Sequence, residues 1–85
     1  MIEDIKMFTV YSKENCPTCV NAKDYLKKLN KNFTVIMVNE FAIDDNEITK
    51  EEFISRFPGV RSVPYIIGPD NKIYKSYNEL IAQVK

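Results

Sequence analysis

Two cysteines separated by two residues are the part of this sequence best suited to chemistry. They form the segment Cys16-Pro17-Thr18-Cys19, and the chain has no other cysteine. Two thiols at this spacing can be oxidised to a disulfide and reduced again, and a cysteine thiolate is the nucleophile in such exchange. The motif therefore predicts a redox-active dithiol with Cys16 and Cys19 as its catalytic residues.

A metal half-site and a pair of inert thiols are the alternatives for this motif. Two thiolates supply only half of a four-ligand zinc site, and the sequence has no histidine to complete it. A metal site would therefore need a second protomer. A buried cysteine with a purely structural role does not require a second cysteine nearby, so inert thiols do not explain the spacing. We favour dithiol–disulfide chemistry and expect no metal ligands.

The cysteines fall where an expected strand, residues 5–11, gives way to an expected helix that runs from Cys16 to about Asn30. Cys16 is expected at the helix N-cap, with Pro17 at the first helical position, where its missing N–H costs nothing. Because a helix N-terminus stabilises negative charge, we expect the pKa of the Cys16 thiol to be lowered. The side chains expected to face inward are Val20, Ala22, Tyr25, Leu26 and Leu29.

The rest of the chain predicts further strands. The almost unbroken apolar segment 34–38 indicates a strand covered on both faces, and strand, helix and strand at this spacing form a right-handed βαβ unit. Residues 39–47 are expected to form an exposed connection. Residues 65–67 and 72–74 are expected to pair as an antiparallel hairpin across the turn 68–71.

Two more helices are predicted from capping boxes, in which a hydroxyl side chain precedes a glutamate by three residues. Thr49 and Glu52 open one helix, and Ser76 and Glu79 open the other. Their expected inward side chains are Phe53, Ile54 and Phe57 in the first and Tyr77, Leu80, Ile81 and Val84 in the second. The predicted order is β-α-β-α-β-β-α: an α/β fold with a four-stranded mixed sheet flanked by three helices, in one domain spanning residues 1–85.

Composition excludes several classes of protein. The formal net charge of the 85 residues is zero, so we expect no nucleic-acid partner. No stretch approaches the roughly 20 apolar residues of a membrane span, and residues 1–6 do not resemble a signal peptide. A single Cys-x-x-Cys pair in such a chain is typical of a reducing compartment. We therefore expect a monomer in the cytoplasm with no membrane partner.

The order of elements, the Cys-Pro-Thr-Cys motif after the first strand and Ser62-Val63-Pro64 before the third resemble the glutaredoxins, especially the small phage and bacterial type. The family's active site reads Cys-Pro-Tyr-Cys, and its second landmark is Thr-Val-Pro with a cis-proline. The resemblance covers essentially the whole chain and implies a thioredoxin-like fold. It also implies a cis Val63–Pro64 bond beside Cys16, with the Val63 backbone free to pair with an extended thiol peptide.

Two segments depart from the family. Thr18 replaces the usual tyrosine, which removes an aromatic wall but keeps a hydroxyl. Lys75-Ser76 replaces the family's Gly-Gly before the last helix, and Asn78 and Glu79 follow where the family holds the γ-glutamyl end of glutathione. The side chains of Lys75 and Ser76 would narrow the groove in which the family binds glutathione, or change which thiol fits there.

The mechanism implied by the resemblance gives each cysteine a role. Cys16 attacks a disulfide, Cys19 resolves the mixed disulfide, and glutathione restores the dithiol. Lys13 is a candidate to stabilise the thiolate or hold a glutathione carboxylate, and Arg61 is a candidate for the same carboxylate, the alternative for each being a solvated surface cation. The expected glutathione-binding residues are Lys13, Thr18, Arg61, Ser62, Val63, Pro64, Ser76 and Asn78.

The leading interpretation is a glutathione-dependent oxidoreductase of protein disulfides, with ribonucleotide reductase as a partner implied by the resemblance. Glutathione would be a co-substrate, and no tightly bound cofactor is expected. One alternative is a thioredoxin-like carrier reduced by a flavin-dependent reductase. Another is a dimer that binds an iron–sulfur cluster through Cys16 and two glutathiones, against which Pro17 argues, because cluster binding in the family is commoner in variants without this proline.

Overall fold

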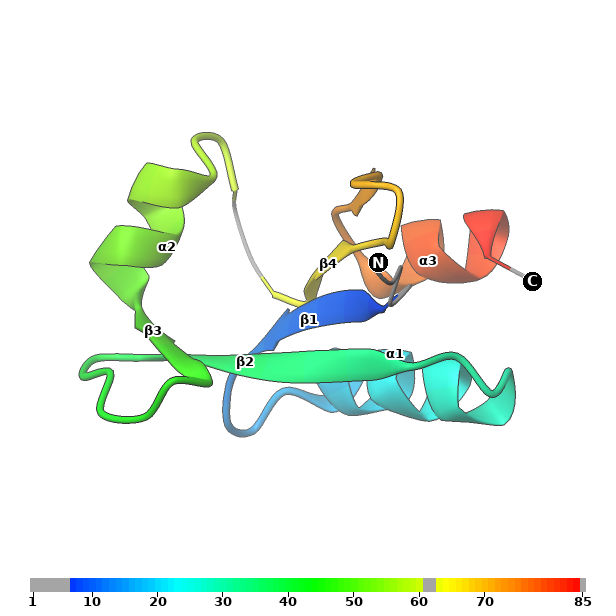
Figure 1. The fold of residues 1–85 in the computed structure, drawn as a ribbon, viewed down its shortest axis with the longest axis horizontal. Helices are drawn as coiled ribbons and strands as arrows, with labels where there is room; N and C mark the ends of the chain where they lie inside the picture. The colour runs from blue at the N-terminus through cyan, green and yellow to red at the C-terminus, as the bar shows by residue number, and fades with distance from the viewer. Residues whose placement is uncertain (1–6, 61–62, 85) are drawn as a thin grey trace, which may run out of the picture.

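The computed structural model describes residues 7–60 and 63–84. Within these residues the chain alternates strands and short helices (Figure 1). The elements in chain order are β1 (Phe8–Ser12), α1 (Pro17–Lys28), β2 (Phe33–Asn39), β3 (Glu47–Thr49), α2 (Lys50–Arg56), β4 (Tyr65–Ile67), β5 (Ile73–Tyr74) and α3 (Tyr77–Gln83).

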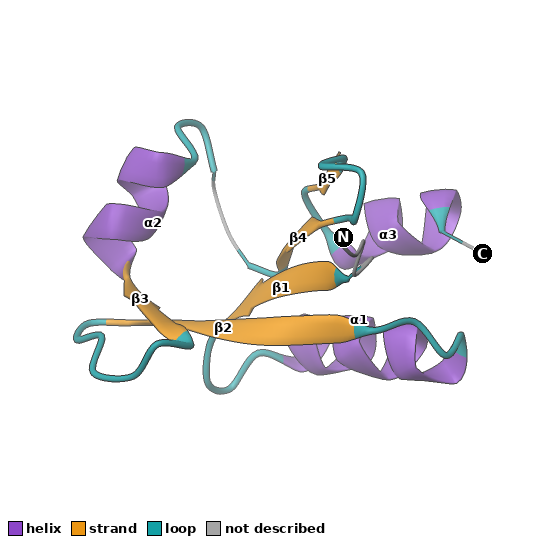
Figure 2. Cartoon of the chain, viewed as in Figure 1, coloured by secondary structure: helices purple, strands orange, loops and turns teal. Residues whose placement is uncertain are grey.

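The strands form one mixed sheet in the order β3-β2-β1-β4-β5 (Figure 2). β2 runs parallel to both β1 and β3, whereas β4 runs antiparallel to β1 and β5. The centre of the sheet is fixed by Val10, which pairs with Val35 on β2 and with Ile66 on β4. This is the thioredoxin-like α/β fold that the sequence predicts, including the βαβ unit and the β4–β5 hairpin.

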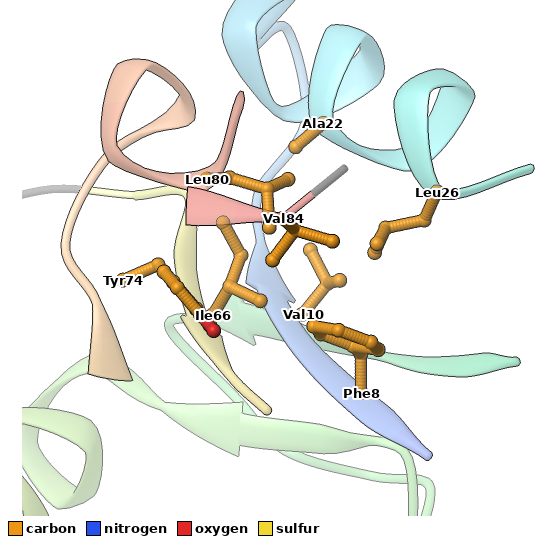
Figure 3. Packing of buried hydrophobic residues seen from close by; sticks show 8 residues of the cluster. All are labelled: Phe8, Val10, Ala22, Leu26, Ile66, Tyr74, Leu80 and Val84. Atoms are coloured by element: carbon orange, nitrogen blue, oxygen red, sulfur yellow. The ribbon is translucent and has the colours of Figure 1, made fainter. Parts of the chain in front are cut away.

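Alternating side chains divide the core between the two faces of the sheet. On one face Val10 and Ile66 pack with side chains from α1 and α3, as Figure 3 shows. On the other face Tyr11 and Tyr65 pack with Phe53 of α2. The Tyr25 hydroxyl of α1 also donates a hydrogen bond to the Val84 carbonyl, just after α3. The helices α1 and α3 therefore cover one face of the sheet, and α2 covers the other.

The strand β3 is the one element that the sequence prediction missed. Residues 39–47 were expected to be only a connection, but Glu47 to Thr49 pair in parallel with Met37 to Asn39. Three residues are too few for a periodic pattern, so the prediction could not distinguish this strand from a loop. The sheet consequently has five strands within the described residues, rather than four.

Two side chains expected to face inward are exposed instead: 49% of Val20 and 47% of Ile54 is accessible to solvent. Val20 follows Cys16 by four residues and precedes Lys23 by three, so it lies on their face of α1. Ile54 directly follows the buried Phe53, and adjacent residues of a helix point about 100° apart. Both errors came from treating every apolar residue as part of the inward stripe.

The predicted helix caps are confirmed at their hydroxyl side chains. Thr49 Oγ1 accepts a hydrogen bond from Glu52 N–H at 3.1 Å, and Ser76 Oγ accepts one from Glu79 N–H at 3.2 Å. The Glu79 carboxylate bonds to Lys75 N–H rather than to the backbone of Ser76. None of the helices in the described part of the chain is long and apolar enough to cross a membrane.

Candidate active site

Cys16 lies at the N-cap of α1, immediately after the loop that leaves β1. Asn15, in the left-handed backbone conformation with φ of 58°, turns the chain into the cap. Pro17 occupies the first turn of the helix, and Cys19 N–H donates to Cys16 Sγ at 3.3 Å. The cap that the sequence predicts therefore places a backbone donor on the Cys16 sulfur, where it would stabilise a thiolate.

The two cysteines form a disulfide in this structure, with their Cα atoms 5.2 Å apart. They differ in exposure: 8% of Cys16 is accessible to solvent and none of Cys19. Only Cys16 can be reached by a bulky disulfide, because Cys19 lies one helical turn deeper. This geometry suits Cys16 as the attacking cysteine and Cys19 as the resolving one.

Two further groups lie close to the Cys16 sulfur. Thr18 Oγ1 is 3.5 Å from Sγ, within reach for its hydroxyl to donate a hydrogen bond to sulfur. The Val63 carbonyl oxygen is 4.0 Å from Sγ, and the Val63–Pro64 bond is cis, as the resemblance implied. The loop before β4 thus lies against the N-terminus of α1, although the two segments are far apart in the sequence.

A cavity of about 170 Å³, which we call the thiol groove, lies beside this contact. Five of the predicted glutathione-binding residues line it, namely Thr18, Val63, Pro64, Ser76 and Asn78. Lys75 and Tyr77 complete the wall. From the sequence, Lys75 was expected to narrow the groove or to change which thiol fits; in the structure Lys75 lines the groove, to which it contributes a positively charged residue.

Of the remaining predicted binding residues, only Lys13 is described, and it lies elsewhere. Lys13 is exposed and lines a separate hollow that opens over Cys16, together with Val20, Lys23 and Met37. It does not line the thiol groove. Arg61 and Ser62 lie outside the described residues. The spacing of four and seven residues from Cys16 on one helix face could have indicated Val20 and Lys23 in advance.

The surroundings of the site are apolar behind the proline loop. Burial raises the pKa of Tyr65, and its neighbour Tyr11 adds to the rise, so Tyr65 remains a neutral phenol.

Across residues 7–60 and 63–84, no three His, Cys, Asp or Glu side chains come close enough together to hold a metal ion. The Cys16–Cys19 pair is itself suited to thiol–disulfide exchange.

A family comparison bears on the same residues. The glutaredoxin family model matches residues 8–71, which include both cysteines and the cis-proline loop. The chain belongs to the glutaredoxin family. It is accordingly a thiol–disulfide oxidoreductase, and Cys16 and Cys19 are the cysteines that match the family's motif.

Solved glutaredoxin structures share this fold. Glutaredoxin 1 from Francisella tularensis, in complex with cacodylate, has a TM-score of 0.69 and 23% identity, over 91% of this chain and 90% of that one. The glutaredoxin from Archaeoglobus fulgidus has a TM-score of 0.64 and 22% identity, over 89% of this chain and 80% of that one. No curated protein sequence gave a significant match. The family match ends before α3, so Ser76 and Asn78 lie beyond it.

Proposed function

We propose that this glutaredoxin uses glutathione to reduce protein disulfides and glutathione mixed disulfides. The observation that supports glutathione is the thiol groove, which is lined by Lys75, Ser76 and Asn78 and by Thr18 and Val63, two residues close to the Cys16 sulfur. Glutathione is a short peptide thiol with two carboxylates, and a cation with nearby hydrogen-bonding groups suits such a ligand. Lys75, which stands where the family has the first glycine of Gly-Gly, would supply this positive charge.

Reduction of a protein disulfide needs both cysteines. The Cys16 thiolate attacks one substrate sulfur, and the other leaves as a thiolate that takes up a proton. The Cys19 thiolate then attacks Cys16 Sγ, which releases the second substrate thiol and leaves the Cys16–Cys19 disulfide seen here. Two electrons have then passed to the substrate, and the protein is oxidised.

Glutathione returns the protein to the dithiol in two exchanges. A first glutathione thiolate attacks Cys16 Sγ, and Cys19 leaves as a thiolate. A second attacks the glutathione sulfur of this mixed disulfide, so glutathione disulfide is released and the Cys16 thiolate is restored. No tightly bound cofactor is needed, because glutathione enters and leaves as a co-substrate.

Coupled turnover tests the choice of reductant. The substrate would be a mixed disulfide between glutathione and a small thiol. The purified protein would be assayed on it once with glutathione and glutathione reductase, and once with thioredoxin reductase instead. We expect rapid turnover only in the glutathione system. Turnover only with thioredoxin reductase would contradict the proposal and support a thioredoxin-like carrier in which Lys75 and Ser76 exclude glutathione from the groove.

The protein partner and the compartment follow from the same proposal. Glutathione-linked reduction belongs to a reducing compartment, which for this chain we propose to be the cytoplasm, with the protein acting as a monomer. Ribonucleotide reductase, the partner implied by the family resemblance, is the first candidate substrate. Its oxidised form can be added to the same coupled assay, where reduction by this protein and glutathione would support the assignment.

A further inference from the structure

A second hollow shares Val63 with the thiol groove. This flanking groove has a volume of about 340 Å³ and is lined by residues of β2 and α2 together with Lys13, Glu40, Val60 and Val63. Its apolar wall consists of Val38, Phe53, Ile54, Val60 and Val63. An apolar cavity of about 150 Å³ holds a benzene molecule, so the flanking groove has room for one aromatic side chain and adjoining backbone.

The flanking groove shares lining residues with the two hollows beside Cys16. Val63 lines both this groove and the thiol groove. Lys13 lines both this groove and the hollow that opens over Cys16. A polypeptide whose cysteine has reacted with Cys16 and whose backbone lies along Val63 would therefore have its neighbouring residues next to the flanking groove.

The charges at the flanking groove indicate what kind of polypeptide fits. Lys13 and Lys50 contribute two positive charges, and Glu40 contributes one negative charge. Lys13 lies in the loop before α1 and Lys50 is the first residue of α2, so the cations come from different elements on one side of the molecule. An acidic side chain next to the apolar one would complement this wall.

We propose that the flanking groove binds an extended segment of the protein substrate next to its reacting cysteine. A large apolar side chain of the substrate packs against Ile54 and Val60, and an acidic side chain lies near Lys13 and Lys50. This inference rests on the proposed reduction of protein disulfides. It assigns substrate selection to Lys50 and Ile54, which lie outside the thiol groove.

The test uses single turnover with pre-reduced protein and no glutathione, so that it is independent of the proposed reductant. Each peptide carries one cysteine in a mixed disulfide with cysteamine, plus a phenylalanine and a glutamate within three residues, placed before the cysteine in one peptide and after it in another. Control peptides carry serine and lysine in place of these residues. Reduction transfers two electrons from Cys16 and Cys19, which releases the peptide thiol and cysteamine.

We expect at least one of the two orders to react about fivefold to tenfold faster than its control peptide, as a buried apolar contact with a neighbouring ion pair would give. Equal rates for all peptides would overturn the proposal. Failure of glutathione turnover with a preserved peptide preference would count against the reductant alone.

Protein variants locate the effect. Ile54→Ser and Lys50→Glu should each lower the rate on the preferred peptide relative to the rate on a small disulfide by about threefold or more. Lys50→Glu should also shift the preference toward a peptide with lysine in place of glutamate, and this charge reversal does not depend on any change in stability. The matched controls are Ile43→Ser, 86% exposed, and Lys28→Glu at the end of α1, neither of which lines the groove.

Two outcomes of these variants contradict the proposal. One is an equal loss of rate on every substrate in Ile54→Ser and Lys50→Glu, with no charge reversal. The other is a wild-type protein that elutes as a dimer and becomes monomeric in Ile54→Ser, because the groove would then be covered by a second copy of the chain.

Discussion

At the scale of single residues, burial separates the tasks of the two cysteines. Cys16 reaches the surface beside the thiol groove, and Cys19 is fully buried one turn further along α1. In the proposed mechanism, a glutathione mixed disulfide is reduced by Cys16 and free glutathione alone, whereas a mixed disulfide with a protein is resolved by Cys19. The two substrate classes therefore depend differently on Cys19.

We predict that Cys16→Ser abolishes all exchange and that Cys19→Ser abolishes only the reduction of protein disulfides. Turnover of glutathione mixed disulfides should persist in Cys19→Ser, because its mechanism uses a single protein thiol. The two variants can be compared in the glutathione-coupled assay with an intact protein disulfide and a glutathionylated peptide. Equal loss of both activities in Cys19→Ser would contradict the single-thiol route.

Thr18 makes a polar contact with the Cys16 sulfur. Its hydroxyl lies 3.5 Å from Sγ, a long hydrogen bond. In Thr18→Val, which keeps the shape but removes the donor, we expect alkylation of reduced Cys16 by iodoacetamide at neutral pH to slow about twofold to fivefold, because a weak bond is worth about 0.5–1 kcal/mol. Thr18→Ser retains the hydroxyl and is the control that should stay near the wild-type rate.

Glu47 organises the loop between β2 and β3. Its carboxylate accepts hydrogen bonds from the backbone N–H groups of Ile43 and Asp44 and from the Asn39 side chain, and these bonds lower the pKa of Glu47. Since the folded state favours the charged form, its stabilisation is present above the ordinary carboxyl pKa and is lost as the pH falls through the lowered value.

We therefore predict that the stability difference between the wild type and Glu47→Gln is constant near neutral pH and shrinks in acid. Urea midpoints of both proteins, measured from about pH 7 to about pH 3, would show this convergence. A difference that grows toward acid would have the wrong sign for a lowered pKa. Asp45→Asn, an exposed change in the same loop, controls for the loss of one negative charge.

At the scale of elements, the start of α2 depends on one hydroxyl. Thr49 ends β3 and also caps α2, so its side chain holds the junction of a strand and a helix. We expect Thr49→Ala to reduce the free energy of unfolding by about 1 kcal/mol. Ser55→Ala, exposed within α2, should change it by less than about 0.5 kcal/mol, so equal urea midpoints of the two variants would contradict the role of the cap.

The same junction shows how far the sequence alone could predict the elements. Thr49 and Ser76 were identifiable as caps because capping is a local pattern of a few adjacent residues. β3 was not identifiable, because its pairing with β2 depends on the loop that Glu47 holds together. Val20 and Ile54 were misplaced because an apolar residue does not itself reveal which face of a helix is covered.

The site divides in a similar way. Cys16, Cys19 and the Val63–Pro64 loop were predictable because they lie in two short motifs. The flanking groove was not, because its wall combines Lys13, the end of β2, α2 and Val60. Only the folded sheet brings these segments together, and no spacing in the sequence indicates them.

At the scale of the whole molecule, α3 connects the core with the active site. Leu80 is fully buried in the core between α1, α3 and the sheet (Figure 3), and the residues at and just before the start of α3 line the thiol groove. We expect Leu80→Ala to lower the free energy of unfolding by about 2–5 kcal/mol, which is a large share of the stability of a domain of this size. Chemical denaturation would measure the loss.

The matched control is Ile43→Ala, which also removes a branched apolar side chain but at a position that is 86% exposed. It should change the free energy of unfolding by less than about 0.5 kcal/mol. A similar small effect of Leu80→Ala would mean that α3 contributes little to the core. If glutathione turnover were nevertheless weaker in this stable variant, the cause would be a change in the thiol groove and not a loss of folded protein.

The hydrogen bonds at the cap of α1 also affect the reduction potential of the Cys16–Cys19 pair. The donors on the Cys16 sulfur stabilise a negative charge that exists only in the reduced protein, so each of them favours the dithiol over the disulfide. Stronger donors make a dithiol protein more oxidising, and weaker ones make it more reducing. The reduction potential of this glutaredoxin can therefore be adjusted at Thr18, with both cysteines left in place.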